Sequence, residues 1–324
     1  MLAVLRGNPM TYVEREKIVG ADAVLKEAGF TVSDACCSRP SCFDFAARKK
    51  STVIFIKLQT DIGNLSPNDC RELRVISESI SAASLLIGEK AREKPLEDDT
   101  VYTRYGIVAV TSRTFENIAV HKTEPLIQAG PGGYYVEVDG GALKRRRQEL
   151  GLSVGEMAEM VGLSRRTLYG YERGMAKASV TAAYNLIATL GIPVAKPLNV
   201  FEKPGPQHRC FLTKAKDMLA RNRLLQKVFR RLSRWNIVTV RRAPFDFVVS
   251  VPEEKMRIIG GVASSNEREL SKRIDEILSV SRVLQAHPVL ITEGQRLSNN
   301  EISCIYGEEL DRIRNPEDLI TSVR

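Results

Sequence analysis

Basic side chains are unevenly distributed along this sequence of 324 residues. Residues 142–196 contain nine Lys and Arg against four Glu, and residues 205–242 contain eleven against a single Asp. The rest of the chain is net acidic, although the whole carries a formal charge of +9. Guanidinium and ammonium groups gathered in this way attract polyanions. The distribution therefore indicates a polyanionic partner such as nucleic acid, bound through these two stretches.

Cysteine and histidine give little support for metal or nucleophilic chemistry. The chain has three scattered histidines and six cysteines, none of them in a C-x-x-C pair. One zinc site remains an alternative, although its spacing matches no common pattern; its ligands would be Cys36, Cys37, Cys42 and Cys70. We expect free thiols, as in cytosolic proteins. We also expect no catalytic cysteine, because no histidine lies in the same segment as these thiols, and no cofactor.

The basic stretch in mid-chain carries clear helix boundaries, and residues 143–193 predict four or five short helices. Ser153 and Glu156 form an S-x-x-E capping box just before an apolar run. That helix is expected to end at Gly162, because glycine tolerates the left-handed conformation of a helix C-terminus. Ser164 then caps a second helix that starts at the next residue. Two short helices joined by a tight glycine-containing turn form a helix-turn-helix.

This stretch resembles the Cro/lambda-repressor type of DNA-binding domain, the XRE family, over about 55 residues. The matching positions are Arg147, Leu150, Gly151, Leu152, Ser153, Glu156, Ala158, Val161, Gly162, Ser164, Tyr171, Glu172, Gly174, Leu186, Leu190 and Gly191. The resemblance implies a five-helix domain that binds double-stranded DNA. In that family the helix after the turn, residues 165–173 here, lies in the major groove with its first residues against the bases.

The resemblance also assigns DNA contacts position by position. Arg165 and Arg166 would read base edges, and Thr167 would contact a base or a phosphate. An arginine can bind the O6 and N7 atoms of guanine as a fork, worth about 1–3 kcal/mol of discrimination. The whole set expected to contact DNA is Ser153, Ser164, Arg165, Arg166, Thr167, Tyr169, Gly170, Arg173 and Lys177.

The second half of the expected recognition helix carries different roles. Tyr169 and Arg173 would contact phosphates. Gly170 stands where relatives often have a longer base-reading side chain, so readout is expected at the first turn. Glu172 is expected to face Arg147 on the first helix and to form the structural ion pair that relatives use.

The regions on either side of the helix-turn-helix repeat one order of elements. Phe43-Asp44-Phe45 recurs as Phe245-Asp246-Phe247. Around each motif the pattern predicts a helix, three strands, a helix, two strands and a closing helix. The main paired ranges are 13–28 and 213–234, 30–35 and 237–241, 53–58 and 256–262, 67 onward and 266–285, 85–87 and 289–291, and 107–110 and 302–305. We expect two α/β domains of αβββαβ type from an internal duplication, although any two α/β segments look alike at this level.

The αβββαβ order, with Asp44 in the second strand and Lys57 late in the third, resembles the restriction-endonuclease and Holliday-junction-resolvase fold. Those nucleases hold Mg²⁺ between the Asp and a carboxylate two residues before the Lys. Phe55 occupies that position here, and Mg²⁺ requires oxygen ligands. The second copy has neither the carboxylate nor the lysine after Asp246. We therefore expect no phosphodiester cleavage, with a metal site completed by another carboxylate as the alternative.

The expected organisation is α/β plus all-α. Its parts are an N-terminal α/β domain at 1–122, a hairpin connector at 123–141, the helix-turn-helix domain at 142–196, a linker at 197–206 and a C-terminal α/β domain at 207–324. The connector is predicted from two strand-like runs around a Gly-Pro-Gly-Gly turn, and residues 89–99 are predicted to be a solvated charged loop. No apolar run approaches the ~20 residues of a membrane helix, so we expect a cytoplasmic protein.

The helix expected at 213–234 allows two interpretations. Its apolar face would pack on the neighbouring sheet, and the remaining positions are rich in arginine and lysine. These charges either are solvated or make supplementary phosphate contacts, and the pattern favours neither. Binding to a membrane surface is a weaker third interpretation.

The layout of the whole chain, with its lead-in at residues 132–140, resembles a family of archaeal regulators that carry a central helix-turn-helix. This implies a sequence-specific transcriptional regulator of double-stranded DNA, acting as a homodimer on half-sites about one helical turn, ~34 Å, apart. The alternative is a nuclease-like DNA-processing enzyme targeted by the helix-turn-helix. The sequence leaves open whether a small-molecule effector exists.

Overall fold

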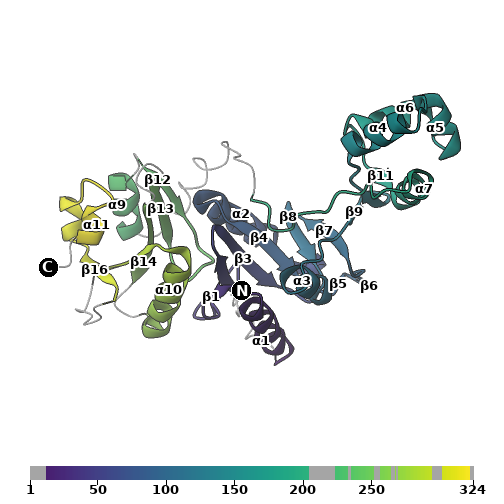
Figure 1. Ribbon diagram of the computed structural model, residues 1–324. Helices are drawn as coiled ribbons and strands as arrows, with labels where there is room; N and C mark the ends of the chain where they lie inside the picture. The colour runs from purple at the N-terminus through teal and green to yellow at the C-terminus, as the bar shows by residue number, and fades with distance from the viewer. Residues whose placement is uncertain are drawn as a thin grey trace, which may run out of the picture. The chain divides into compact units, whose positions relative to one another are not determined.

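The computed structural model describes residues 12–203, 223–232, 235–251, 256–263, 267, 269–293 and 301–321. It is a mixed α/β protein with a helical segment in the middle of the chain (Figure 1). The chain forms two compact units, one of residues 1–60, 64–86 and 201–324 and the other of residues 61–63 and 87–200. Part of the helix expected at 213–234 lies outside the described residues, namely 213–222 and 233–234.

The first unit begins with an α/β segment that follows the predicted order. Its elements are α1 (Tyr12–Glu27), β1 (Thr31–Val32), β2 (Phe45–Lys49), β3 (Thr52–Leu58), α2 (Pro67–Ile80) and β4 (Ala83–Ile87). The strands lie in the order β1-β2-β3-β4, with β1, β2 and β3 antiparallel. α2 begins as the sequence predicts, because Ser66 accepts a hydrogen bond from Asn68 N and Pro67 occupies the first turn.

The C-terminal part of the same unit contains a second sheet with a similar arrangement. Its elements are α9 (Arg223–Leu232), β12 (Asn236–Thr239), β13 (Phe247–Val251), β14 (Met256–Ala263), α10 (Leu270–Leu284), β15 (His287–Thr292), β16 (Ser303–Tyr306), η2 (Glu309–Arg312) and α11 (Asp318–Thr321). The strand order is β12-β13-β14-β15-β16, antiparallel through β14 and parallel from there on. Buried side chains of α9 and of the strands form one hydrophobic core beneath this sheet.

The two motif aspartates make the same backbone contacts in the two parts. Asp44 N donates to Ile56 O at 2.8 Å, and its carboxylate accepts from the backbone N–H of Leu58 at 2.6 Å. Asp246 repeats both contacts with Gly260 and Val262, also at 2.8 and 2.6 Å. Each aspartate immediately precedes its strand, β2 or β13, rather than lying within it. The carboxylates therefore tie the start of one strand to the end of the next.

A pair of glutamates joins the two parts through reciprocal hydrogen bonds. Glu72 of α2 accepts from the backbone N–H groups of Arg241 and Arg242, at 2.9 and 2.8 Å. Glu276 of α10 accepts from those of Cys37 and Ser38, at 2.8 and 2.7 Å. Donors and acceptors correspond at one constant spacing of 204 residues, from 72 to 276 and from 37 to 241. Each segment thus binds the long helix of the other in the same way.

Charged side chains strengthen this internal contact. Arg39 donates to Phe245 O at 2.6 Å and pairs with the Asp246 carboxylate at 2.9 Å. In the other direction, Arg242 Nε lies 2.5 Å from Asp69 Oδ1. Burial lowers the pKa of Arg39, and the negative charge of Asp246 opposes that effect. Helix α10 packs on β2, and α2 packs on β12 and β13. Each copy therefore packs its long helix on the sheet of the other copy, in addition to the charged contacts.

The second unit combines a small sheet with the helical segment. Its strands are β5 (Lys90–Ala91), β6 (Lys94–Pro95), β7 (Thr100–Arg104), β8 (Ile107–Val110), β9 (Ile127–Gly130), β10 (Gly133–Val136) and β11 (Ala178–Ser179), and α3 (Ser112–Ala119) follows β8. The order β8-β7-β9-β10-β11 contains the predicted hairpin as β9 and β10. The charged segment 89–99, predicted to be a solvated loop, is mostly exposed and contains the short pair β5 and β6. Strand β7 was not predicted.

The helical segment has four helices: α4 (Gly140–Glu149), α5 (Val154–Met160), α6 (Arg165–Glu172) and α7 (Val180–Leu190). The fifth helix expected within residues 142–196 is not found there, since the described residues 192–200 contain no helix. Proline at 193 and 197 removes two N–H donors. Lys196 N instead donates to Glu137 O at 2.7 Å, and Val194 O accepts from Asp139 N at 2.8 Å. The exit segment therefore bonds back to residues 137–139, which lie between β10 and α4. None of the helices in the described ranges could span a bilayer.

We expect Glu72→Gln and Glu276→Gln each to destabilise the first unit. Each substitution replaces a charged acceptor of two backbone N–H groups by a neutral one, and bonds to charged groups contribute about 1.5–3 kcal/mol. Urea unfolding followed by tryptophan fluorescence and circular dichroism measures the loss. Glu27→Gln, at an exposed site in α1, is the control. Midpoints equal to that of the control would show that the reciprocal contact contributes nothing.

Candidate nucleic-acid interface

The helix before the turn, α5, begins with the predicted capping box. Ser153 Oγ accepts from Glu156 N at 3.2 Å, and Glu156 Oε2 accepts from Ser153 N at 2.7 Å. Hydrogen bonds from the Ser153 hydroxyl and from the Ser153 backbone N–H to the carboxylate lower the pKa of Glu156. The helix ends before Gly162, whose φ of 71° is the left-handed conformation that the sequence predicted. The turn into the next helix is therefore determined by local signals.

The first turn of α6 is exposed and its polar groups point outward. Ser164 caps the helix by accepting from Thr167 N at 3.0 Å, and the two hydroxyl oxygens lie 2.8 Å apart. Arg165 and Arg166 are exposed, whereas Leu168 on the opposite face is fully buried. The helix is thus anchored by its apolar face and presents two guanidinium groups at its N-terminal end.

Arg165 lies across the start of the preceding helix. A Cβ atom placed on Gly155 would lie 2.8 Å from Arg165 Nε and 3.0 Å from its Cζ. The small residue in α5 therefore makes room for this guanidinium. The consequence is that Arg165 lies beside the exposed N-terminus of α5, where Ser153 is also located. The structure brings these two predicted contact residues onto one surface.

A buried ion pair connects α6 to α4. Arg147 Nε and Nη2 donate to the two carboxylate oxygens of Glu172 at 2.6 and 3.1 Å, and Nη1 donates to Leu152 O at 2.8 Å. The hydrogen bonds to Glu172 raise the pKa of Arg147. Only 10% of the arginine side chain and 6% of the glutamate side chain are exposed. The ion pair expected from the sequence is therefore present in bidentate form.

The N-terminus of α4 also touches the end of α6 directly. A Cβ atom on Gly140 would lie 2.4 Å from Tyr171 O and 2.5 Å from Glu172 O, which are backbone atoms. Real Cβ atoms do not approach backbone so closely, so only glycine fits. Asp139 caps α4 by accepting from Ala142 N at 2.9 Å, and this bond lowers its pKa. Together with the ion pair, this contact fixes α6 against α4.

The second half of α6 only partly matches the expected contact surface. Tyr169 and Arg173 are exposed, and the Arg173 guanidinium lies 5.1 Å from the centre of the Tyr169 ring. Gly170 is buried and faces Ala176, whose Cβ would be 3.9 Å from a Cβ added at 170. Gly170 therefore points toward Ala176 within the segment, and its inclusion among the DNA contacts stays a prediction.

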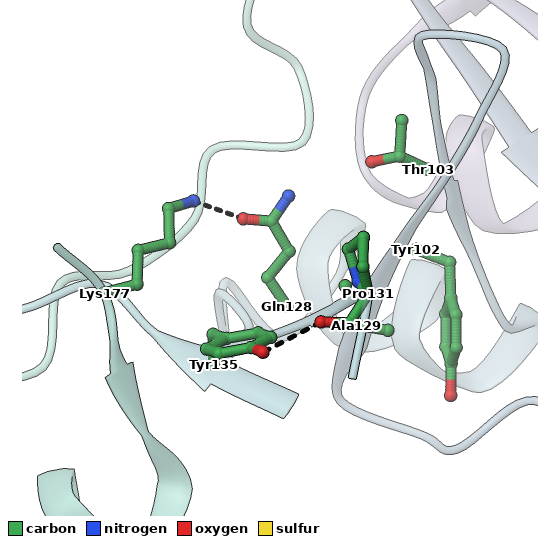
Figure 2. A pocket seen from close by; sticks show the side chains of 8 residues that line it. Tyr102, Thr103, Gln128, Ala129, Pro131, Tyr135 and Lys177 are labelled. Atoms are coloured by element: carbon green, nitrogen blue, oxygen red, sulfur yellow. Dashed lines mark hydrogen bonds between the residues drawn. The ribbon is translucent and has the colours of Figure 1, made fainter. Parts of the chain in front are cut away.

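Lys177 follows α6 and is already engaged within the protein. Its ammonium donates to Gln128 Oε1 of β9 and lies 3.9 Å from Glu137 Oε2 (Figure 2). Tyr135 of β10 lies beside it and donates its hydroxyl to Pro131 O at 2.9 Å. Lys177, Gln128 and Tyr135 line an open cavity of about 800 Å³, together with Tyr102 and Thr103 of β7. The sequence could not reveal this cavity, because β7 itself was missed.

The Asp44 motif of the nuclease-like segment is buried, and its polar groups bond to neighbouring groups of the protein. Asp44 is 5% exposed and pairs with Lys57 at 2.9 Å, while Lys57 also donates to Ser41 O at 3.1 Å. Phe55, at the position of the missing carboxylate, is fully buried with its ring centre 4.7 Å from that of Phe43. Throughout the part of the chain that the structure describes, no three His, Cys, Asp or Glu side chains gather as a metal site.

Asp69 and Cys42 lie near the motif, and burial shifts the pKa of both side chains. Burial raises the pKa of Asp69, although the positive charges of Arg242 and Lys57 oppose the rise. Burial also raises the pKa of the Cys42 thiol well above its usual range, which disfavours the reactive thiolate. The described residues of this centre are therefore a lysine–aspartate pair, a carboxyl group with a raised pKa and a protected thiol.

The described part of the basic helix, α9, is amphipathic as expected. Its apolar side is buried in the core of the second sheet, and its charged side chains are exposed. The buried set is Leu224, Leu225, Val228 and Leu232, and the exposed set is Arg223, Lys227, Arg230 and Arg231. Arg231 pairs with Asp311 at 2.8 Å. The expected basic residues 221 and 234 lie outside the described residues.

Comparison with known families gives two matches on this chain. A model of the PD-(D/E)XK superfamily domain matches residues 16–125, which include Asp44 and Lys57. A model of the helix-turn-helix matches residues 143–196, which include α5, α6 and α7. The two matches support the two resemblances inferred from the sequence, and both fall on described elements.

Curated relatives match almost the whole chain. A protein of Methanosarcina acetivorans is 31% identical over 306 residues, which are 92% of each chain. Proteins of Methanococcoides burtonii and Archaeoglobus fulgidus are 32% and 31% identical over 93% of this chain and 93% and 94% of theirs. All three are named as HTH-type transcriptional regulatory proteins.

We expect Gly140→Ala to destabilise the helical segment while Gly141→Ala is tolerated. The first substitution forces a methyl group against the backbone of α6, at a cost of about 1–3 kcal/mol. At Gly141 the nearest atoms, 3.3 Å away, belong to side chains that can move. Thermal unfolding followed by circular dichroism compares the neighbouring variants. Equal melting temperatures would contradict the close approach of α4 and α6.

Proposed function

The chain belongs to the archaeal family of HTH-type transcriptional regulatory proteins, and we propose that it binds specific double-stranded DNA by placing α6 in the major groove. The observation that supports this most is the first turn of α6. Arg165 and Arg166 are exposed there, while Leu168 and Tyr171 anchor the opposite face. A helix held in this way can enter a groove with its N-terminal side chains leading.

The proposed contacts divide by position on this surface. Arg165, Arg166 and Thr167 contact base edges, since the first turn of a recognition helix reaches deepest into the groove. Ser153 and Ser164 lie at helix N-termini, where the helix dipole and free N–H groups favour phosphate. The further phosphate contacts are Tyr169, Arg173 and Lys177. For Lys177 to reach DNA, its ammonium must leave Gln128.

We propose that the two flanking α/β parts are copies of one domain. The two copies pack against each other and together carry the helix-turn-helix. The support is the repetition of the motif aspartates and of the Glu72 and Glu276 contacts at corresponding positions. The segment that contains the helix-turn-helix is inserted between these copies. One chain therefore carries one DNA-binding helix for every two α/β copies.

We propose further that the nuclease-like copies do not cleave DNA. Phe55 fills the position of a required carboxylate with a fully buried aromatic ring, and a divalent ion needs oxygen ligands there. The Lys57 ammonium forms an ion pair with the Asp44 carboxylate, with Nζ 2.9 Å from Oδ1. The match to the PD-(D/E)XK superfamily is then explained by a retained scaffold, and a metal-dependent nuclease is the second candidate that an experiment must exclude.

For DNA binding, we expect Arg166→Ala and Arg165→Ala each to weaken specific binding by about 1–3 kcal/mol. Loss of a base contact should affect nonspecific binding much less. The probe is a duplex recovered by selection from a random pool, with fluorescence anisotropy as the readout and scrambled duplex as competitor. Arg113→Ala removes a charge that is 77% exposed elsewhere in the second unit and serves as control. Variants that bind as tightly as this control would refute the proposal.

For cleavage, we expect no nicking of supercoiled plasmid with Mg²⁺ or Mn²⁺ by the wild type, and none by Asp44→Ala. The reason is that one carboxylate paired with a lysine cannot hold the ion that such a reaction requires. Gel electrophoresis of the plasmid over several hours is the measurement. Nicking by the wild type that disappears in Asp44→Ala would establish the enzyme as the correct alternative.

A further inference from the structure

We propose that the Lys177 cavity, the open space lined by β7, the β9–β10 hairpin and Lys177, binds a small aromatic anion that competes with DNA for this lysine. The competition rests on the proposed function, in which Lys177 contacts a DNA phosphate. The binding of the anion does not, because it concerns only the cavity and the groups that line it.

The Lys177 cavity has the size of a site for a small organic ligand. Its volume is about 800 Å³, and pockets that bind such ligands usually have about 300–1,000 Å³. The strands that line it are neighbours in one sheet, since β7 pairs with β9 and β9 pairs with β10. Hydrogen-bonded strands of the second unit therefore hold the walls of the cavity in place.

Two tyrosine rings line the cavity from different strands (Figure 2). Tyr135 of β10 donates its hydroxyl to Pro131 O at 2.9 Å, and its ring lies against Gly130, where an added Cβ atom would be 3.3 Å away. Tyr102 of β7 accepts from Glu97 N at 2.9 Å, and burial raises its pKa to about 12. Both rings are therefore held and uncharged, and they suit the planar face of an aromatic ligand.

Lys177 gives the cavity its charge, because it is the one charged residue among the described residues that line it. Its ammonium donates to the neutral Gln128 Oε1 and lies 3.9 Å from Glu137 Oε2. The side chains of Lys177 and Glu137 are each 45% exposed, and so long and exposed an ion pair contributes little. A ligand carboxylate or phosphate can therefore replace Gln128 as the acceptor, since hydrogen bonds between charged groups are stronger than those to neutral ones.

The lining as a whole favours a small molecule over the DNA duplex itself. Two aromatic rings and one ammonium fit a ligand that has a planar ring and one anionic group, while Thr103 and Gln128 add a hydroxyl and an amide for hydrogen bonds. A duplex presents phosphates, but its bases are stacked inside and would leave the tyrosine rings without a partner. The required chemistry occurs both in nucleoside monophosphates and in aromatic carboxylic acids.

Lys177 connects the cavity to the proposed DNA-binding surface. It lies five residues after the end of α6 and directly before β11, which pairs with β10. One ammonium cannot bond a ligand in the cavity and a DNA phosphate at the same time. The ligand therefore weakens DNA binding, and DNA weakens ligand binding by the same factor, because the coupling of two binding equilibria is reciprocal.

The test is isothermal titration calorimetry of the full chain without DNA. The probes are adenosine monophosphate and indoleacetate, with adenosine as the ligand that lacks an anionic group. Lys177→Gln removes the charge, and Thr103→Trp fills the cavity from an exposed position of β7 where folding should persist. Lys122→Gln, at an exposed lysine before β9, is the matched control. Fluorescence anisotropy then measures binding of the selected duplex with and without a saturating probe.

We expect the wild type and Lys122→Gln to bind at least one of the two anions, and the anion that binds identifies its source. Lys177→Gln should bind it at least fivefold more weakly, Thr103→Trp should not bind it, and adenosine should bind the wild type no more tightly than Lys177→Gln. The saturating anion should weaken duplex binding at least threefold in the wild type and leave that of Lys177→Gln unchanged.

The site is refuted if neither anion binds the wild type, or if binding is the same in Lys177→Gln and Thr103→Trp. Weaker duplex binding by Thr103→Trp without any probe would assign the cavity to DNA and would also overturn the inference. An anion that binds through these residues without changing duplex affinity would overturn the competition. Failure of the proposed function looks different, since the chain would then prefer no duplex while calorimetry still decides the cavity.

Discussion

The bidentate pair between Arg147 and Glu172 is the interaction on which the DNA-binding surface depends. It joins α4 to the end of α6, and the contact of Gly140 with the α6 backbone leaves no space for another arrangement. Buried ion pairs add little net stability compared with apolar packing, but removing one partner is costly. Its role is therefore geometric, because it fixes the direction in which Arg165 and Arg166 leave the protein.

The carboxylates of the flanking copies show a related use of charge. Asp44 and Asp246 accept backbone N–H groups of the neighbouring strand, and Glu72 and Glu276 accept those of the other copy. These four carboxylates thus accept hydrogen bonds from backbone donors of the protein and stabilise the first unit.

The sequence predicted those features that depend on contacts between residues close together in the chain. Ser153 with Glu156, Ser164 and Gly162 set helix ends through neighbouring atoms, so those boundaries were found. The fifth helix is not found within 142–196, where Val194 and Lys196 bond to Asp139 and Glu137, more than fifty positions earlier. The facing direction of Gly170, the strand β7 and the Lys177 cavity also depend on tertiary contacts. The reciprocal contacts of Glu72 and Glu276 could not be predicted for the same reason, since Glu72 and Arg241 are 169 residues apart.

Enrichment of duplexes from a random pool by the full chain measures whether α6 reads DNA sequence. We expect a single enriched motif with two related half-sites about one helical turn apart, and a changed motif when Arg166 is replaced. Enrichment of no motif, or an unchanged motif from the Arg166 variant, would contradict it.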